Sequence, residues 1–280
     1  MRVSINIQTG NYNAERVCKA YAEGISAVGD KAILRTDKDA DMNGYDAAVF
    51  WGYWQNCQRI VKVCERDKKP YVYVDLGYWR RERGYFKAAM NHRHPTKYLM
   101  SKSMPHDRWQ ALDMNIASWK RNGGKTVVVA GMSGKGAWSW GMEGGQYEKG
   151  VIDQLRQFST RPIVYRPKPN WHQAVPIVGS DMDRLSPIAT LLHRAHCVVT
   201  HHSNVGCDAV VAGVPVLTRH AAALHMGLPD TDLKRVENPC YPEGREQWAA
   251  NLAYCQWTLE EMRYGVAWRH MKPLLGATMQ

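Results

Sequence analysis

Hydrophobic residues in the first part of the chain fall into short runs, separated by segments of helical period. The runs are rich in Val, Ile, Ala and aromatic residues, which favours strands. The predicted strands are 3–7, 32–35, 45–52 and 70–75, and the predicted helices between them are 14–24 and 56–67. Because strands that alternate with helices form parallel sheets covered on both faces, this half predicts a doubly wound α/β domain.

The same alternation continues in the second half, after a flexible break at residues 122–124. The predicted strands there are 126–130, 162–169, 197–200 and 216–218, and the predicted helices are 147–158, 186–195 and 246–269, the last with a break near Thr258 or Gly265. Between the halves, 84–97 has no clean period and predicts a loop, whereas 105–120 predicts a helix. We therefore expect two domains, 1–122 and 123–280, with a last helix able to cross back onto the first domain.

A polar loop interrupts the apolar second half directly after the predicted strand 197–200. The loop consists of Thr200, His201, His202, Ser203 and Asn204. Ligands of open α/β sheets bind at the carboxyl ends of strands, and imidazoles, a hydroxyl, an amide and free helix N–H groups suit a phosphate or diphosphate. The alternative is that Ser203 only caps its helix and that the histidines are solvated.

This loop, followed by Asp208 and by Ala212-Gly213-Val214-Pro215-Val216, resembles the donor-site segment of nucleotide-sugar glycosyltransferases of the GT-B fold. The second part of the motif also suits related epimerases. The resemblance implies an α/β chain of two Rossmann-like domains that face a central cleft. The C-terminal domain would hold a nucleotide diphospho-sugar, UDP-sugar foremost, and the N-terminal domain the acceptor. The donor-binding residues that it implies in this segment are His201, His202, Ser203, Asn204 and Asp208.

Two further segments of the second half complete the donor site that the resemblance implies. A glycine-rich loop follows strand 126–130 and matches neither a Walker A loop nor G-x-G-x-x-G. Strand 162–169 ends in two cations, which in similar glycosyltransferases balance the leaving diphosphate and can replace a metal ion, so no obligatory metal is expected. The alternatives are an ordinary loop and a solvated strand end. The expected donor contacts in these segments are Gly131, Ser133, Gly134, Lys135, Arg166 and Lys168.

Asp75 is the one acid at a strand end among many bases in the first half. Glycosyl transfer needs a base that takes the proton of the acceptor hydroxyl as it attacks the anomeric carbon, and a carboxylate at the sheet edge can do this. Asp75 is therefore the predicted catalytic residue. Alternatively, it caps the next turn or pairs with Arg80 or Arg81.

Positive charge is concentrated beside this predicted base. The chain carries a net charge of +11, and residues 76–121 hold ten Lys/Arg against three acids, a net +7. Such a concentration favours a polyanionic acceptor, double-stranded DNA above all. The phage DNA glucosyltransferases, GT-B enzymes that modify hydroxymethylated bases flipped out of the duplex, are similar in architecture and charge. The residues expected to contact DNA are Trp54, Tyr78, Arg80, Arg81, Arg83, Lys87, Arg93 and Lys97.

Two alternatives to a DNA glycosyltransferase remain open. One is a glycosyltransferase that acts on a lipid-linked or surface polysaccharide, with the basic residues meeting anionic lipid. The other is a non-enzymatic DNA-binding α/β protein, which would leave the His201 loop unexplained.

The remaining features are those of an ordinary globular chain of 280 residues, 45% hydrophobic and 22% charged. It holds no apolar run long enough to span a bilayer, and its first residues lack a signal-peptide core. The seven cysteines include no CxxC pair and no zinc spacing, which indicates reduced thiols. We expect a monomeric cytoplasmic protein, in the host cytoplasm if it is viral.

Overall fold

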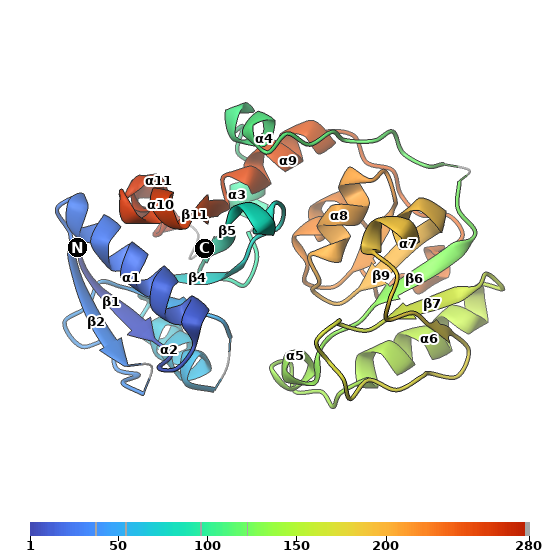
Figure 1. Cartoon of the computed structure of the whole chain (residues 1–280), viewed down its shortest axis with the longest axis horizontal. Helices are drawn as coiled ribbons and strands as arrows, with labels where there is room; N and C mark the ends of the chain where they lie inside the picture. Colours follow the sequence, from blue (N-terminus) through green and yellow to red (C-terminus); the bar gives the residue numbers. More distant parts are fainter. Residues whose placement is uncertain (37, 54, 96, 122, 278–280) are drawn as a thin grey trace. The chain divides into compact units, whose positions relative to one another are not determined.

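The structure is a computed structural model that describes residues 1–36, 38–53, 55–95, 97–121 and 123–277 (Figure 1). The chain divides into two compact units. The first unit comprises Met1–Leu112 and Ala250–Gln280, and the second unit comprises Asp113–Ala249. The C-terminal segment, drawn red in Figure 1, thus belongs with the blue N-terminal elements.

The first unit is built on a six-stranded sheet in the order β11-β5-β4-β3-β1-β2. The four predicted strands are confirmed, and neighbours among them run parallel: β1 (Arg2–Ile7), β2 (Lys31–Thr36), β3 (Ala47–Trp51) and β4 (Tyr71–Leu76). Two antiparallel strands extend the sheet beyond β4, namely β5 (Tyr85–Met90) and β11 (Gln256–Thr258). The predicted loop at 84–97 is therefore wrong where β5 lies. Lys87 obscured this strand, because a charged residue interrupts its apolar pattern although its side chain is buried.

Helices cover both faces of this sheet. The side chains of β3 alternate between the faces, as the pleat of a strand requires. Val49 and Trp51 belong to a core cluster with α1 (Tyr12–Ala27), whereas Phe50 belongs to a cluster with α2 (Gln55–Arg66). Burial on both faces explains why these strands read as nearly continuous apolar runs.

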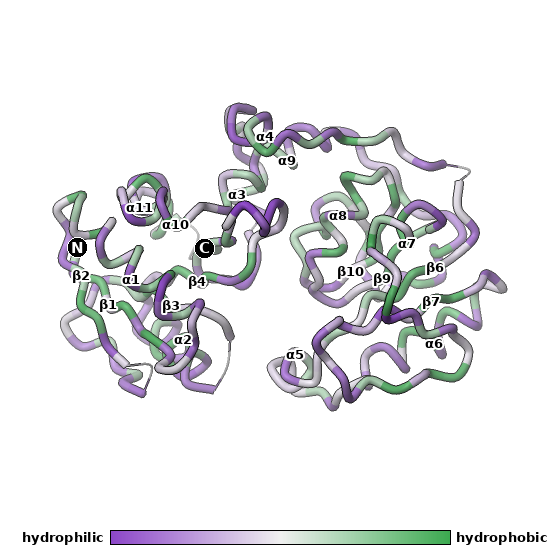
Figure 2. The backbone as a smooth tube through the Cα atoms, in the orientation of Figure 1, coloured by the Kyte–Doolittle hydropathy of each residue, from purple (hydrophilic) through white to green (hydrophobic). Residues whose placement is uncertain are grey.

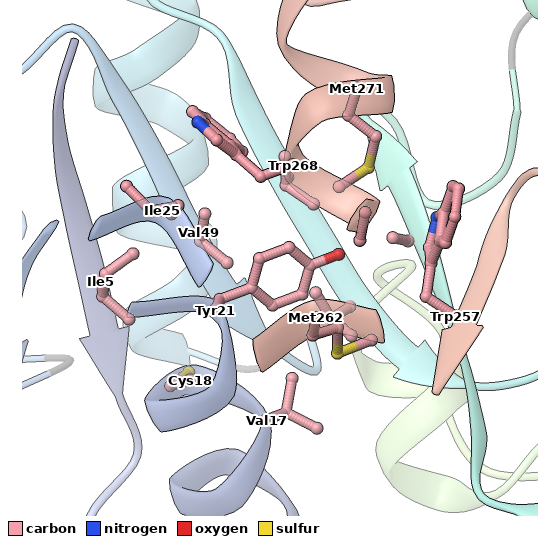
Figure 3. Packing of buried hydrophobic residues seen from close by; sticks show 14 of the residues in the cluster. Ile5, Val17, Cys18, Tyr21, Ile25, Val49, Trp257, Met262, Trp268 and Met271 are labelled. Carbon is pink, nitrogen blue, oxygen red and sulfur yellow. The ribbon is translucent and has the colours of Figure 1, made fainter. Parts of the chain in front are cut away.

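The C-terminal helices α10 (Leu259–Arg263) and α11 (Val266–Met271) pack on α1 in the first of these clusters, whose buried side chains are drawn in Figure 3. Gly265 lies between the two helices with a φ of 74°, and a Cβ on it would lie 2.6 Å from the carbonyl oxygen of Gly24. A glycine is required there by both conformation and space. The predicted break near Thr258 or Gly265 is confirmed, since Thr258 caps α10 and Gly265 precedes α11.

Two helices predicted near the junctions between the units are shorter than expected. The helix prediction over 246–269 was wrong at 256–258, because α9 (Arg245–Ala253) is followed by β11, whose three residues are too few for a periodic signal. The prediction over 105–120 reduces to α4 (Asp107–Ala111). The chain after α4 is held by tertiary contacts instead: a Cβ on Gly213 would lie 2.1 Å from the carbonyl oxygen of Ser118.

The second unit has a parallel five-stranded sheet in the order β10-β9-β6-β7-β8. The four predicted strands are confirmed and β8 is additional: β6 (Thr126–Ala130), β7 (Ile163–Arg166), β8 (Asp181–Met182), β9 (Ala195–Thr200) and β10 (Val216–Thr218). The main helices are α6 (Gln146–Phe158), α7 (Ile188–Arg194) and α8 (Val205–Val211). The central strand β6 is buried along its whole length and coloured as hydrophobic in Figure 2, as expected inside a parallel sheet.

Short elements complete both units: α3 (Lys97–Met100), α5 (Gly134–Trp138), η1 (Arg81–Arg83), η2 (Ala222–Met226), η3 (Leu233–Arg235) and η4 (Lys272–Leu274). Across the described ranges, every helix falls short of the length and apolarity needed to cross a membrane.

Candidate donor site and acceptor edge

The carboxyl ends of four parallel strands stand in one row in the second unit. Ala130 at the end of β6 pairs with Arg166 at the end of β7 and with Thr200 at the end of β9, and Thr200 pairs with Thr218 at the end of β10. This row brings the glycine-rich loop, the Arg166 strand end and the His201 loop to one edge of the sheet. Ligands of open α/β sheets bind at such an edge.

The glycine-rich loop packs closely against its surroundings. A Cβ on Gly131 would lie 2.9 Å from Glu148 Oε1, and a Cβ on Gly136 would lie 3.6 Å from His202 Cε1. Ser133 Oγ accepts a hydrogen bond of 3.1 Å from Gly136 N, which caps α5. The predicted loop residues therefore adjoin the predicted histidine loop. Gly134 and Lys135 are the first two residues of α5, and Lys135 is exposed.

Glu148 braces this loop from within the protein. Its side chain has no exposed surface, and its Oε1 accepts a hydrogen bond of 2.5 Å from Met132 N. Burial raises the pKa of Glu148 above its ordinary value, although the bond from Met132 N lowers it. Within the described part of the chain, Oε2 is buried without a hydrogen-bond partner. The sequence analysis missed Glu148, because a single Glu in an amphipathic helix gives no sign that it is buried and holds a loop.

Three histidines gather around one tryptophan at the β9 and β10 ends. The buried ring of His201 packs edge-on against Trp140 and Tyr147, with ring centres 4.9 and 5.0 Å apart. His201 Nδ1 lies 3.1 Å from His202 Nδ1, so one of these nitrogens carries the shared hydrogen. His220 stacks on Trp140 at 4.2 Å with an interplanar angle of 11°. The predicted pair of histidines thus belongs to a larger aromatic cluster.

A buried carboxylate supports this cluster. Asp230 accepts hydrogen bonds from Tyr147 Oη at 2.9 Å and from Arg219 Nε at 2.8 Å. Burial and the neighbouring Asp230 raise the pKa of Tyr147 well above its ordinary value, so the phenol stays a neutral donor. The sequence gave no sign of this arrangement, because Asp230 lies in an irregular segment between two predicted elements.

The remaining residues of the polar loop are tied to the backbone around them. Thr200 Oγ1 donates to the carbonyl oxygen of Ala130 at 2.8 Å, and Ser203 Oγ accepts from Val205 N at 3.3 Å. Asn204 occupies the cap position of α8 without a side-chain cap bond. Asp208 lies one turn further along α8 and is half-buried.

The two predicted cations after β7 differ in their surroundings. Arg166 Nη1 donates to the backbone carbonyl oxygens of Asp183 and Arg184, and so ties the end of β7 to the chain that follows β8. Lys168 is exposed beside the same strand end. Of the two, Lys168 is the more accessible to a ligand.

Asp75 ends β4 in the first unit and is half-buried. It accepts hydrogen bonds from Tyr73 Oη at 2.5 Å and from Leu76 N at 2.8 Å, and it lies opposite Lys87 in β5. Burial and the Asp75 carboxylate raise the pKa of Tyr73 well above its ordinary value, so Tyr73 is a neutral donor to this carboxylate.

The residues expected to contact DNA differ in how accessible they are. Tyr78 and Lys87 are 1% and 5% exposed, which leaves little surface for a base or phosphate. Arg80 and Arg81 donate to the carbonyl oxygens of Leu112 and Gly77, and the Arg93 guanidinium lies 3.4 Å from the centre of the Tyr53 ring. Arg83 and Lys97 are exposed. Trp54 lies outside the described residues.

The described ranges contain no group of three or more His, Cys, Asp or Glu arranged to hold a metal ion. The cysteines in them are free thiols, and all except the half-buried Cys240 are buried. Burial is the main cause that raises the pKa of Cys18, Cys64, Cys197 and Cys255, which keeps these thiols protonated and unreactive.

No protein-family model and no curated protein matches this sequence. Among solved structures, the chain is similar to Thermosulfurimonas dismutans KpsC, a beta Kdo 2,4 transferase, with 12% identity, a TM-score of 0.51 and 90% of each chain covered. A beta Kdo 2,7 transferase structure of the same KpsC matches at 14% identity and a TM-score of 0.49, over 96% of this chain and 100% of that one. The UDP-GlcNAc 2-epimerase of Methanocaldococcus jannaschii matches at 8% identity and a TM-score of 0.35, over 90% of this chain and 98% of that one.

Two units, each with a parallel sheet core, and a likeness that spans nine-tenths of both chains confirm the fold that the resemblance implied. The protein has the GT-B fold, the α/β architecture of two Rossmann-like units found in nucleotide-sugar glycosyltransferases.

Proposed function

We propose that this protein is a glycosyltransferase that binds a nucleotide diphospho-sugar in its second unit, with a UDP-sugar as the first candidate donor. The observation that carries the proposal is the row of four strand ends, because it gathers three separate segments that the resemblance implies for the donor. The GT-B fold supports the same reading. A structural cap or a solvated loop would not require three histidines packed around Trp140.

The proposed chemistry is direct transfer of the sugar to an acceptor hydroxyl. The hydroxyl oxygen attacks the anomeric carbon, the bond from that carbon to the diphosphate breaks, and the diphosphate leaves with the electron pair. Asp75 takes the hydroxyl proton. His202 and Lys168 stabilise the negative charge that develops on the diphosphate, and Arg166 adds positive charge at the end of β7, so that a metal ion is not obligatory.

The acceptor that we favour is a saccharide. Much of the basic segment 76–121 is engaged in internal contacts, and a beta Kdo 2,4 transferase shares the fold. A hydroxymethylated base in double-stranded DNA is the second candidate. The net charge of +11 and the exposed cations Arg83 and Lys97 favour it.

Calorimetry with a panel of nucleoside diphosphates tests the donor site. We expect one nucleotide to bind, and we expect His202→Ala and Lys168→Ala each to weaken its binding by roughly 1.5–3 kcal/mol, the scale of a hydrogen bond to a charged group. Lys149→Ala is the matched control, because Lys149 is an exposed lysine of the same unit that pairs with Asp153. Unchanged affinity in both site variants would remove the nucleotide from this edge.

A further inference from the structure

Arg16 in α1 is a cation held between two aromatic rings. Its guanidinium carbon lies 5.0 Å from the centre of the Tyr12 ring and 5.0 Å from the centre of the Phe86 ring. Its Nε is buried and has no hydrogen-bond partner. Throughout the described ranges, no side-chain or backbone oxygen forms a hydrogen bond or ion pair with this guanidinium.

Such an arginine is unusual for physical reasons. A guanidinium is charged at any physiological pH and presents five N–H donors in a rigid fork. Aromatic faces attract its charge but do not satisfy those donors, and a buried donor without an acceptor is destabilising. Several other half-buried arginines of this protein meet an oxygen acceptor, as Arg108 meets the Glu261 carboxylate and Arg166 meets the backbone carbonyl oxygen of Asp183. An acceptor for Arg16 is therefore expected from a ligand.

Arg16 lies near the strand end that carries the proposed base, but on the other face of the sheet. Phe86, over which it lies, pairs with Leu76 in β4 and belongs to the cluster on the α1 face, whereas Asp75 is bonded to Tyr73 of the α2-face cluster. The Phe86 ring also packs edge-on against Trp51 at the end of β3, with centres 5.5 Å apart. Arg16 thus stands at the edge of the first sheet where the parallel strands β3 and β4 end, across the sheet from Asp75, so that an acceptor spanning this edge would meet both side chains.

We propose that Arg16 binds an anionic group of the acceptor, so that the acceptor is an acidic saccharide bearing a carboxylate or a phosphate. This inference rests on the proposed glycosyl transfer. A single fork, fixed in orientation by two rings, matches one planar or tetrahedral oxyanion bidentately. A nucleic-acid backbone would instead need a track of accessible cations, whereas Arg80, Arg81 and Lys87 are engaged or buried nearby.

The test is an NMR titration of the full-length chain labelled with ¹⁵N-arginine, which reports the Arg16 Nε–H directly. The probes are glucuronate, inorganic phosphate, glucose and a short DNA duplex. We expect glucuronate or phosphate to shift the Arg16 resonance saturably and glucose to leave it unmoved. A larger response to phosphate than to glucuronate supports the site and assigns a phosphorylated saccharide to it.

Three variants complete the test. Arg16→Met keeps the apolar stem between the rings and removes the fork, and we expect it to weaken anion binding at least about tenfold, the loss of a hydrogen-bonded charge. Arg16→Lys keeps the charge and should restore part of the affinity. Arg59→Gln in α2 is the matched control, since Arg59 is exposed and its loss changes the net charge equally.

The inference is overturned if neither anion moves the Arg16 resonance, if glucose moves it equally, or if only the duplex does. Equal anion affinity of Arg16→Met and the wild type overturns it as well. Nucleotide binding to each variant is measured in parallel. If the wild type binds no nucleotide, the proposed function is contradicted. If the wild type binds nucleotide but the Arg16 resonance responds to neither anion, only the Arg16 site is contradicted.

Discussion

At the scale of single residues, the candidate site depends on carboxyl groups in three different settings. Asp75 is half-buried with two hydrogen-bond donors, Asp230 is buried between a cation and a phenol, and Glu148 is buried with one backbone donor. Only the first is accessible enough to exchange a proton with a substrate. The other two hold chain segments in place.

Replacement of Asp75 by Asn tests its role as the base. We expect Asp75→Asn to fold and to bind nucleotide normally, because the amide oxygen still accepts one of the two hydrogen bonds. Turnover should fall about 10²–10⁴-fold, the contribution of general base catalysis. Tyr73→Phe is the control: it removes one donor but keeps the carboxylate, so a decline below about tenfold is expected from one hydrogen bond. Equal declines in the two variants would reassign Asp75 to a structural role.

Replacement of Glu148 tests the role of this buried acid behind the glycine-rich loop. Since its folded pKa is raised, the unfolded state releases the proton first, and stability is lost as the pH rises from about 4.3 through the folded pKa. Glu148→Gln keeps the oxygen that accepts from Met132 N, so its denaturation midpoints should lack this decline. Glu148→Ala should lose about 1–3 kcal/mol at any pH, because Met132 N is left without an acceptor. Identical pH profiles of the wild type and Glu148→Gln would contradict the assignment.

At the scale of elements, Gly24 and Gly265 allow the C-terminal helices to pack against α1. A Cβ on Gly24 would lie 1.8 Å from the carbonyl oxygen of Met262, so Gly24→Ala must separate α10 from α1. We expect a loss of roughly 2–4 kcal/mol in urea unfolding, the scale of a severely overpacked core. Gly150→Ala in α6 is the matched control. Open space surrounds Gly150, and we expect a gain of about 0.5–1 kcal/mol from helix propensity. A Gly24→Ala variant as stable as the wild type would show that the two helices are not held this closely.

The sequence predicted the elements whose pattern is set by burial on a large sheet. The strands β1, β3, β4, β6 and β9 are long apolar runs between turn residues, and each was expected within a few residues of its observed bounds. Where tertiary contacts override local pattern, the sequence was a poor guide. Lys87 hid β5 because the sequence does not show that a cation is buried among aromatic rings.

The candidate site, like the fold, could be predicted from the sequence only where a local pattern marks it. The polar loop at 200–204 and the glycine-rich loop stand out because polar and glycine residues interrupt apolar strands. Trp140, Asp230 and Arg16 do not stand out, since their importance comes from partners distant in sequence. Single residues of this kind show no periodicity and match no motif. They become visible only when the fold brings their partners together.

At the scale of the whole molecule, the two ends of the described chain meet within the first unit. Asp30 accepts hydrogen bonds from Trp268 Nε1 at 2.7 Å and from Lys272 Nζ at 2.9 Å, and it also contacts the Met1 amino group. Burial alone would raise the pKa of Asp30, but these donors outweigh it and lower the pKa to about 2. The cluster therefore couples the ionisation of one carboxyl to the docking of the C-terminal segment.

Acid titration of Asp30→Asn tests this coupling. Because the folded pKa is depressed, the stabilisation is present above the unfolded value of about 3.9 and is lost as the pH falls through about 2. We expect the variant to be roughly 2 kcal/mol less stable at neutral pH, with the difference disappearing below pH 2. Asp41→Asn serves as the control, since the Asp41 side chain is 53% exposed and its ion pair with Arg35 should contribute less than about 1 kcal/mol. A difference that persists unchanged into acid would exclude the charge as its cause.

The distribution of charge over the whole molecule decides between the two acceptor classes. If DNA is bound, released counterions make the logarithm of the affinity fall with the logarithm of salt by about 0.9 per phosphate contact. Among the residues that the sequence assigned to DNA, Arg83 and Lys97 are exposed, whereas the exposed Arg81 is engaged by the Gly77 carbonyl oxygen, so a slope no steeper than about −2 is expected. Arg83→Gln and Lys97→Gln should each flatten it by up to about one unit. Arg80→Gln should not, because Arg80 Nε is engaged by the Leu112 carbonyl oxygen. The measurement is a salt titration of fluorescent duplex binding. A slope of about −4 or steeper would need phosphate contacts from cations now engaged within the protein, and DNA would then replace the acidic saccharide as the favoured acceptor.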